Sequence, residues 1–131
     1  ANSAQRYEYG TVNTSLIAGL RAALSCWQAI GADAIWRRNR KLTCQLAEGL
    51  HGIGAQVLTT TRSASILSFG IPGVPHANVQ SFLWNKHRIR LRGIYEGNLN
   101  AIRASIHLYN TPAEVDRALG AMDAALNKLR P

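Results

Sequence analysis

The chain has few of the residues that build disulfide frameworks or metal sites. Among its 131 residues are 2 cysteines and 4 histidines. Cys26 and Cys44 stand alone within helical patterns, where they are typical of small core or interface residues. The histidines lie far apart and show no ligand-pair spacing. These patterns disfavour a disulfide-stabilised domain and a zinc site.

Long apolar runs are also missing. No stretch approaches the roughly 20 apolar residues that a membrane-spanning helix needs. Nothing in the sequence has the charged, apolar and small-residue order of a signal peptide. We therefore take the cytoplasm as the default compartment.

The length of the chain is that of one domain, and a hydrophobic content of 47% is sufficient for one globular core.

Acidic residues are scarce as well, since 7 of them face 15 lysines and arginines for a net charge of +8. Such an excess favours binding to phosphate backbones through counterion release. The basic residues gather at 37–41 and 86–92, but no standard nucleic-acid module surrounds either cluster. The first cluster also suits a solvated helix face. A stand-alone module that binds nucleic acid or another acidic partner remains an alternative.

Hydrophobic periodicity predicts an alternation of helices and strands. Helical spacing predicts helices over 14–30 and 33–50, the first ended by Gly31 and the second capped by Asp33, then one from about Pro75 and one after Thr111. Period-two alternation predicts strands over 56–60, 64–71, 88–92 and 102–108. This order favours an α+β domain with a small, mainly antiparallel sheet that helices cover on one side.

The last of these helices has the clearest start signal. Thr111 stands at the N-cap, Pro112 at the first helical position and Glu114 at the third, where its carboxylate can reach back to the cap. Apolar residues then recur at spacings of three and four, which predicts a buried amphipathic helix. These residues are Val115, Leu119, Met122, Leu126 and Leu129.

Arg103 is the unusual residue of the strand before that helix, because it stands between two apolar neighbours. One interpretation is an exposed strand face or an ion pair with one of the few acids. The other is a guanidinium held on a rigid element to grip a ligand carboxylate through two parallel hydrogen bonds. Spacing alone does not choose between them.

Two segments resemble a known family. The string IRASIHLYNTPAEVDRAL, residues 102–119, closely resembles the end of the class V aminotransferase family. These are pyridoxal-phosphate (PLP) enzymes of fold type I, and they include cysteine desulfurases and isopenicillin N epimerase-like proteins. The string RYEYGTVN, residues 6–13, resembles the family's arginine-x-glutamate-x-glycine-threonine signature. The motifs stand in the family's order, and the resemblance covers nearly the whole chain.

The resemblance implies the C-terminal small domain of a fold-type I PLP-dependent transferase. Residues 1–31 would end the large-domain or connecting segment, with a long helix that packs on a missing large α/β domain. Residues 32–131 would form the small α+β domain. The family's cofactor lysine lies upstream, and the three lysines here stand in no cofactor motif. The fragment alone is thus expected to be inactive, and the full-length protein to be a PLP-dependent homodimer.

The resemblance also implies site residues. Arg103 matches the arginine that grips the substrate's α-carboxylate, and Arg92 matches an arginine of the preceding active-site strand. Thr11 matches the threonine that binds the PLP phosphate of the neighbouring subunit, with Gly10 allowing close approach. PLP would serve as the electron sink for a carbanion at the substrate's Cα. No catalytic residue and no metal ligand is implied within this chain.

The segment between the two arginines bears on the reaction type. Cysteine desulfurases carry a nucleophilic cysteine there, because a thiolate must attack the substrate sulfur. Residues 93–102 read GIYEGNLNAI and contain no cysteine. The resemblance therefore favours an aminotransferase, epimerase or lyase acting on an amino acid. A catalytically dead structural or dimerisation domain that keeps the fold is the remaining alternative.

Overall fold

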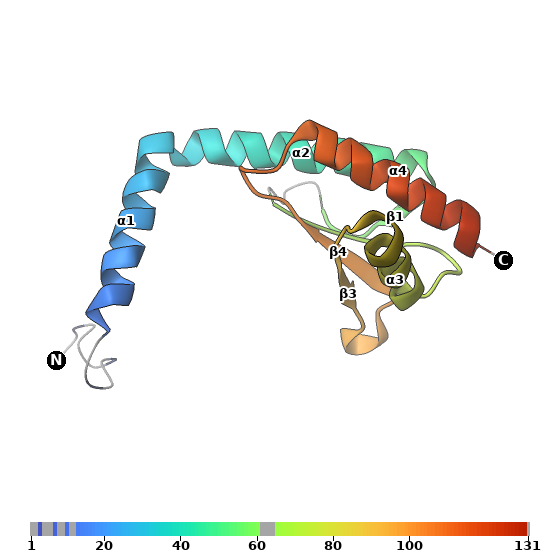
Figure 1. The fold of residues 1–131 in the computed structure, drawn as a ribbon, viewed down its shortest axis with the longest axis horizontal. Helices are drawn as coiled ribbons and strands as arrows, with labels where there is room; N and C mark the ends of the chain where they lie inside the picture. The colour runs from blue at the N-terminus through green and yellow to red at the C-terminus, as the bar shows by residue number, and fades with distance from the viewer. Residues whose placement is uncertain (1–2, 4–6, 8–9, 11–12, 61–64, 131) are drawn as a thin grey trace. The chain divides into compact units, whose positions relative to one another are not determined.

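The computed structural model describes residues 3, 7, 10, 13–60 and 65–130. The chain forms two compact units, residues 1–34 and 35–131. The second unit contains the hydrophobic core and the sheet, whose strands are drawn as arrows in Figure 1. The residues with candidate roles are therefore distributed over two separate bodies.

The first unit contains helix α1 (Thr14–Ile30), whose bounds are those predicted from the sequence. Its N-cap is Asn13, whose Oδ1 accepts a hydrogen bond from the Leu16 backbone N–H at 3.1 Å, and Gly31 ends it at φ 90°. No residue of the helix is buried. Its large apolar residues, Leu16, Ile17, Leu20, Leu24, Trp27 and Ile30, are all exposed. Among the described residues of this unit, none buries the apolar side of α1.

The second unit has the α+β order that the sequence predicts. Its elements are α2 (Ala32–Gly52), β1 (Gln56–Val57), β2 (Ile66–Gly70), α3 (His76–His87), β3 (Arg92–Ile94), the 3-10 turn η2 (Glu96–Asn98), β4 (Ala101–Ser105) and α4 (Pro112–Leu129). The strands form one sheet in the order β1-β2-β4-β3, and every neighbouring pair is antiparallel. The predicted small antiparallel sheet is confirmed.

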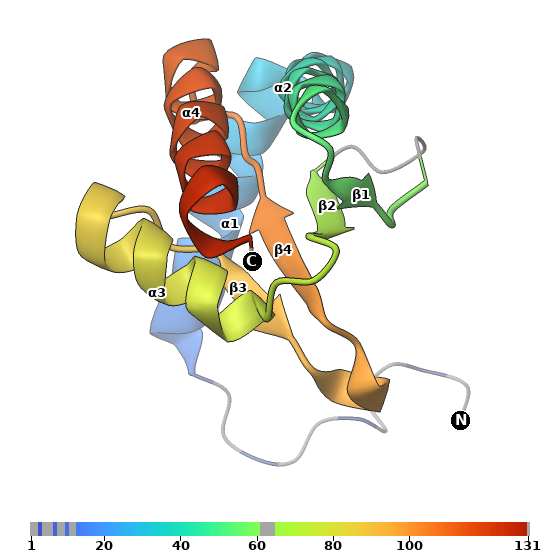
Figure 2. The same cartoon turned by 90° about the vertical axis from the view of Figure 1, so that its right-hand side faces the viewer.

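Helices cover one face of this sheet. Leu67, Phe69, Ile102 and Ala104 are buried and share that face, because side chains alternate along a strand. They join buried residues of the three helices in one cluster: Leu42, Leu46 and Leu50 of α2, Val79 and Leu83 of α3, and Val115, Met122 and Leu126 of α4. Figure 2 shows α2 and α4 side by side above the strands, with α3 beside α4. No described helix of this unit covers the opposite face, which we call the open face.

A glycine lets α2 and α4 approach closely. A Cβ on Gly49 would overlap the Leu119 side chain, so any larger residue would push that side chain aside. One turn earlier, Gln45 Nε2 donates a hydrogen bond to Asp116 Oδ1 at 2.7 Å. Packing of the Leu119 side chain on the Gly49 backbone and one polar link therefore set the spacing of the two helices over the core.

The strand predicted over 88–92 is mostly wrong. Arg88 ends α3 in the left-handed region at φ 55°, and the Ile89 N–H donates back to the Leu83 carbonyl at 3.1 Å. This helix stop uses the residues that would start the strand, so β3 begins only at Arg92. The alternation was real, since Ile89 packs against the core whereas Arg88 and Arg92 are exposed. This alternation belongs to an extended segment that has one side on the core but is not paired in the sheet before Arg92.

The other strands are shorter than predicted where local contacts replace the ladder. After β1, the Leu58 and Thr59 N–H groups both donate to the Ser68 carbonyl, at 2.8 and 3.3 Å. At the end of β4, the Ile106 N–H donates to the Ser65 carbonyl at 2.7 Å. Asp33 lies in the first turn of α2, which starts one residue before it, so it is not the N-cap that was predicted.

Replacing a buried leucine of the second unit should lower the free energy of unfolding much more than replacing an exposed leucine of α1. Leu46→Ala, at a site 3% exposed, should lower the free energy of unfolding by about 2–5 kcal/mol because it leaves a cavity. Leu20→Ala, on α1 at a site 60% exposed, is the matched control and should change it by less than about 0.5 kcal/mol. Urea unfolding of the 131-residue chain, followed by circular dichroism, measures both. Equal losses would contradict the assignment of the core.

The predicted capping box at α4 is confirmed. Thr111 Oγ1 accepts a hydrogen bond from the Glu114 N–H at 3.2 Å, and Glu114 Oε2 accepts from the Thr111 N–H at 2.8 Å. The Thr111 N–H, followed by the Asn110 side chain, holds the pKa of Glu114 below its ordinary value of 4.5. The ionised carboxylate therefore stabilises the start of the helix.

This pair predicts a pH-dependent contribution to stability. Thr111→Ala should cost about 1 kcal/mol at neutral pH, as other N-cap losses do. The contribution of the Glu114 charge should be present above pH 4.5 and disappear as the pH falls through the lower folded-state pKa. Thermal melts of Glu114→Gln and wild type should therefore converge on acidification. Glu48→Gln on exposed α2 surface is the control, and a difference that persists at low pH would refute the charge effect.

Candidate functional site

The open face of the sheet carries two arginines in directly paired positions. Arg92 on β3 is the register partner of Arg103 on β4. Both point away from the core because their neighbours Gly93, Ile102 and Ala104 are buried on the other side. Like charges directly opposite one another on adjacent strands are destabilising. An anion near this pair would relieve the repulsion.

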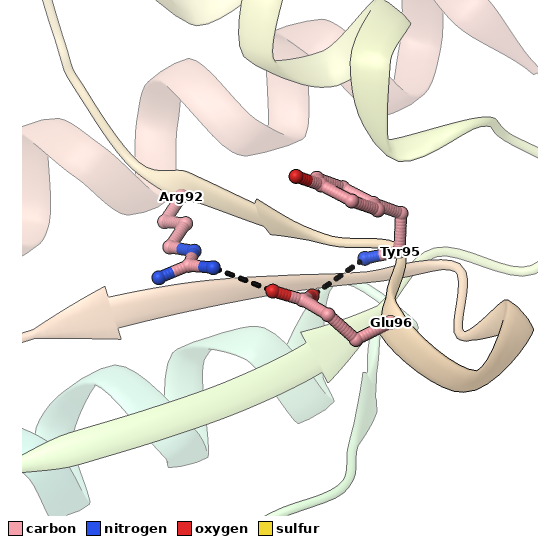
Figure 3. Close-up of polar contacts among 3 residues, drawn as sticks. All are labelled: Arg92, Tyr95 and Glu96. Carbon is pink, nitrogen blue, oxygen red and sulfur yellow. Dashed lines mark hydrogen bonds and ion pairs between the residues drawn. The ribbon is translucent and has the colours of Figure 1, made fainter.

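Arg92 has such an anion within the chain. Its Nη2 lies 2.5 Å from Glu96 Oε1, and the Tyr95 N–H donates to Glu96 Oε2 at 3.1 Å, as Figure 3 shows. The pKa of Glu96 is lowered first by its own backbone N–H, then by the Tyr95 N–H and the Arg92 charge. Both partners are about half exposed, at 53% and 54%. The Glu96 carboxylate is thus oriented by the Tyr95 N–H and offsets the charge of Arg92.

The loop that holds Glu96 is fixed by Asn100. Asn100 Nδ2 donates to the Val74 carbonyl at 2.8 Å, and its Oδ1 accepts from the His76 N–H at 2.7 Å. The His76 ring stacks on Tyr95 with ring centroids 6.3 Å apart. These contacts tie both ends of the loop to the start of α3, so Glu96 is held beside Arg92 by more than one ion pair.

Arg103 lacks a partner of this kind. Its side chain is partly buried, and its Nε is buried with no hydrogen-bond partner among the residues described. No acidic side chain of residues 13–60 and 65–130 forms an ion pair with it. Leaving a buried donor of a charged group unsatisfied costs free energy. Arg103 is therefore poised to bind an anion from outside the described chain.

A hollow of about 430 Å³ lies beside these groups. It is lined by Gln80, Arg90, Leu91, Arg92, Arg103 and Ser105. Its three guanidinium groups, of which only Arg92 is paired with a described acid, make it positive, and Ser105 supplies a hydroxyl on the same strand face as Arg103. Chemically, this arrangement can bind and orient a small anionic ligand. Its guanidinium donors suit a carboxylate, because two parallel N–H groups match the two oxygens.

The structure brings two of the four expected site residues together. Arg103 and Arg92 lie side by side at the hollow. Gly10 belongs to the other unit and has φ 137°, a conformation that suits glycine, with open space where a Cβ would stand. Thr11 lies outside the described residues. The roles of all four remain predictions.

Sequence reasoning did not find Glu96 or assign Arg90 a site role. Glu96 follows Arg92 by four positions, which is a signal that could have been read. The sequence places Arg90 only in a basic cluster and a predicted strand, whereas it lines the hollow from an extended segment after α3. Its neighbours there, Gln80 and Ser105, come from distant parts of the sequence. No local pattern links those three residues.

Neither a metal-ligand cluster nor a membrane-spanning helix is found in the part of the chain that the structure describes. Within residues 13–60 and 65–130 no three histidine, cysteine, aspartate or glutamate residues group as metal ligands would. Over the same ranges no helix combines the length and the apolar character needed to cross a bilayer. The unpartnered Arg103 Nε and the hollow beside it are the observations that favour a site on the open sheet face.

Comparison with known proteins places the chain in context. The family model described as aminotransferase class-V matches residues 1–118. A probable cysteine desulfurase of Pyrococcus abyssi is 31% identical over 140 aligned residues, which cover 96% of this chain and 34% of that protein. The curated relatives are thus about three times as long as this chain.

Solved structures agree on the fold. The apo cysteine desulfurase of Thermococcus onnurineus NA1 matches 98% of this chain and 35% of its own, with 27% identity and a TM-score of 0.86. An alanine–glyoxylate aminotransferase of Nostoc sp. matches 95% and 34%, with 26% identity and a TM-score of 0.76. A variant of the cystine C–S lyase C-DES, with glycine covalently linked to its PLP cofactor, matches 94% and 32%, with 27% identity and a TM-score of 0.80. Neighbours with three different activities share this fold.

The arrangement around Glu96 can be tested directly. A carbon-13 NMR titration should give Glu96 a pKa below its ordinary 4.5. Arg92→Met should raise that pKa but leave it below 4.5, because the Glu96 and Tyr95 backbone N–H groups still lie near the carboxylate. Arg88→Met, at an exposed arginine away from Glu96, should leave it unchanged. An unshifted Glu96 in the wild-type chain would contradict the geometry of Figure 3.

Proposed function

The chain belongs to the class V aminotransferase family, and we propose that it is the C-terminal, substrate-binding portion of a PLP-dependent enzyme acting on an amino acid. The observation that carries this proposal is the buried, unpartnered Nε of Arg103 at the edge of a positive hollow. A chain that spans about a third of its curated relatives supplies only part of such an enzyme. The remaining parts, the cofactor lysine among them, would come from the rest of the polypeptide.

Arg103 would hold the substrate's α-carboxylate. A guanidinium on a central strand offers two parallel hydrogen bonds from a rigid base, and these fix both the position and the rotation of the carboxylate. The bonds to Cα are thereby oriented as well. Arg92 would add positive charge beside the carboxylate, while Glu96 keeps the Arg92 side chain in place. The roles of these residues are binding and orientation.

The residues of the N-terminal motif fit the phosphate of PLP. Gly10 has φ 137° and open space beside its Cα, so its backbone can approach an oxyanion closely, and Thr11 follows with a hydroxyl. In our proposal they bind the PLP phosphate of a neighbouring subunit, so the intact enzyme is a homodimer. When bound, PLP supplies the electron sink for the carbanion at the substrate's Cα.

We further propose that residues 1–31 connect to a large cofactor domain and that residues 32–131 are the small domain. The division of the chain into compact units at residues 34 and 35 supports this boundary. So does α1, which has six large apolar side chains exposed and none buried. A stripe of that kind is typical of a helix that packs on another domain.

The reaction is proposed to be of the aminotransferase, epimerase or lyase type. Desulfurases need a nucleophilic thiolate in the segment between the two arginines. Here residues 93–102 contain no cysteine, and this segment instead holds Glu96 against Arg92. An alanine–glyoxylate aminotransferase and a cystine lyase among the structural neighbours support these reaction types.

The proposal predicts a spectroscopic result for the protein expressed from the complete gene. Wild type should show the visible absorbance of bound PLP, and an amino-acid substrate should shift it. Arg103→Ala should bind PLP normally but need about 10–100-fold more amino acid for the same shift, because a charged hydrogen-bond pair is lost. Arg37→Ala, at an exposed arginine of α2, is the control. Absence of a PLP band even with added cofactor would overturn the proposal.

A further inference from the structure

Arg90 gives the hollow a second guanidinium that forms no ion pair with a described acidic side chain. It lines the hollow together with Arg92 and Arg103. Among the described residues, Glu96 pairs with Arg92, and no acidic side chain pairs with Arg90 or Arg103. One substrate carboxylate on Arg103 would therefore leave the Arg90 charge uncompensated. The charge of the hollow suits a ligand with two anionic groups.

The position of Arg90 is set by contacts on both sides. The carbonyl of the next residue, Leu91, accepts a hydrogen bond from Gln80 Nε2 at 2.9 Å, which ties the backbone to α3. The Arg90 guanidinium lies over the Trp84 ring, 5.9 Å from its centroid. A cation held on an aromatic face keeps its N–H groups free for an anion at the edge. Arg90 is thus a positioned group and not only a solvated side chain.

Ser105 adds a neutral donor at the same place. It follows Arg103 by two residues on β4, so both side chains point to the open face, and both line the hollow. Arg90 lines the same hollow from the extended segment that precedes β3. A guanidinium and a hydroxyl that line the same hollow as Arg92 and Arg103 can together bind a second anionic group.

We infer that the amino acid bound at this site carries a second anionic group, a carboxylate or a phosphate on its side chain, which Arg90 and Ser105 recognise. This inference rests on the proposed function, because Arg103 must hold the α-carboxylate. It narrows the substrate to the class of acidic or phosphorylated amino acids. Arg92 is not the second anchor, since Glu96 already occupies it.

The test uses the 131-residue chain and simple anions. The arginine Nε–H signals of the nitrogen-15-labelled protein are followed by NMR at low ionic strength, while butyrate, glutarate or 3-phosphonopropionate is added. Glutarate or the phosphonate should bind roughly three- to tenfold more tightly than butyrate, as expected for one further, partly exposed charged contact. The probe that gains more identifies a carboxylate or a phosphate as the second group.

Single-residue variants show which arginine causes the preference for the dianions. Arg90→Gln should remove the preference for the dianions and weaken butyrate binding much less, because for a monoanion only the general positive charge of the hollow is reduced. Arg88→Gln is a matched control, because Arg88 also lies over Trp84, at 5.7 Å, but does not line this hollow. Arg103→Gln should lose both kinds of binding. The amide spectrum of each variant shows whether it has kept its fold.

The outcomes distinguish a failure of this inference from a failure of the proposed function on which it rests. Equal binding of butyrate and the two dianions by wild type would overturn the second anionic group but leave the carboxylate role of Arg103 intact. A preference that survives Arg90→Gln would overturn the role of Arg90. No binding of any of the three anions by a folded wild-type chain would overturn both the inference and the proposed role of Arg103.

Discussion

The alternation of side chains along β4 constrains both the core and the site. One face of this strand places Ile102 and Ala104 in the hydrophobic cluster, and the other places Arg103 and Ser105 at the hollow. A shift of one residue in register would exchange the two sets. Burial of the apolar face therefore holds the guanidinium on the open face, and the stability of the core and the geometry of the site have one cause.

Electrostatic repulsion is the cost of this arrangement. The register places Arg92 opposite Arg103, and the hollow adds Arg90 nearby. Glu96 relieves only part of the repulsion, because it binds one guanidinium from a fixed loop. A site that tolerates uncompensated positive charge in its free state binds anions more tightly, since the ligand removes the repulsion as it forms its own contacts.

The sequence predicts much of the fold because many of its signals are local. The bounds of α1 and the capping box of α4 depend on residues within one helical turn of each other, and both were predicted correctly. The strand over 88–92 was wrong because a left-handed stop at Arg88 and a period-two pattern use the same residues. Only packing against the core distinguishes an extended segment from a paired strand.

For the site, the sequence by itself determined that Arg103 stands on a strand face opposite the core, and its resemblance to a family suggested a role. It did not determine what surrounds Arg103. Gln80, Arg90 and Ser105 meet at the hollow because α3 and the two strands pack together, and Nε is buried for the same reason. Spacing along the chain encodes which face a side chain takes, whereas burial and unpaired charge arise only when distant segments come into contact.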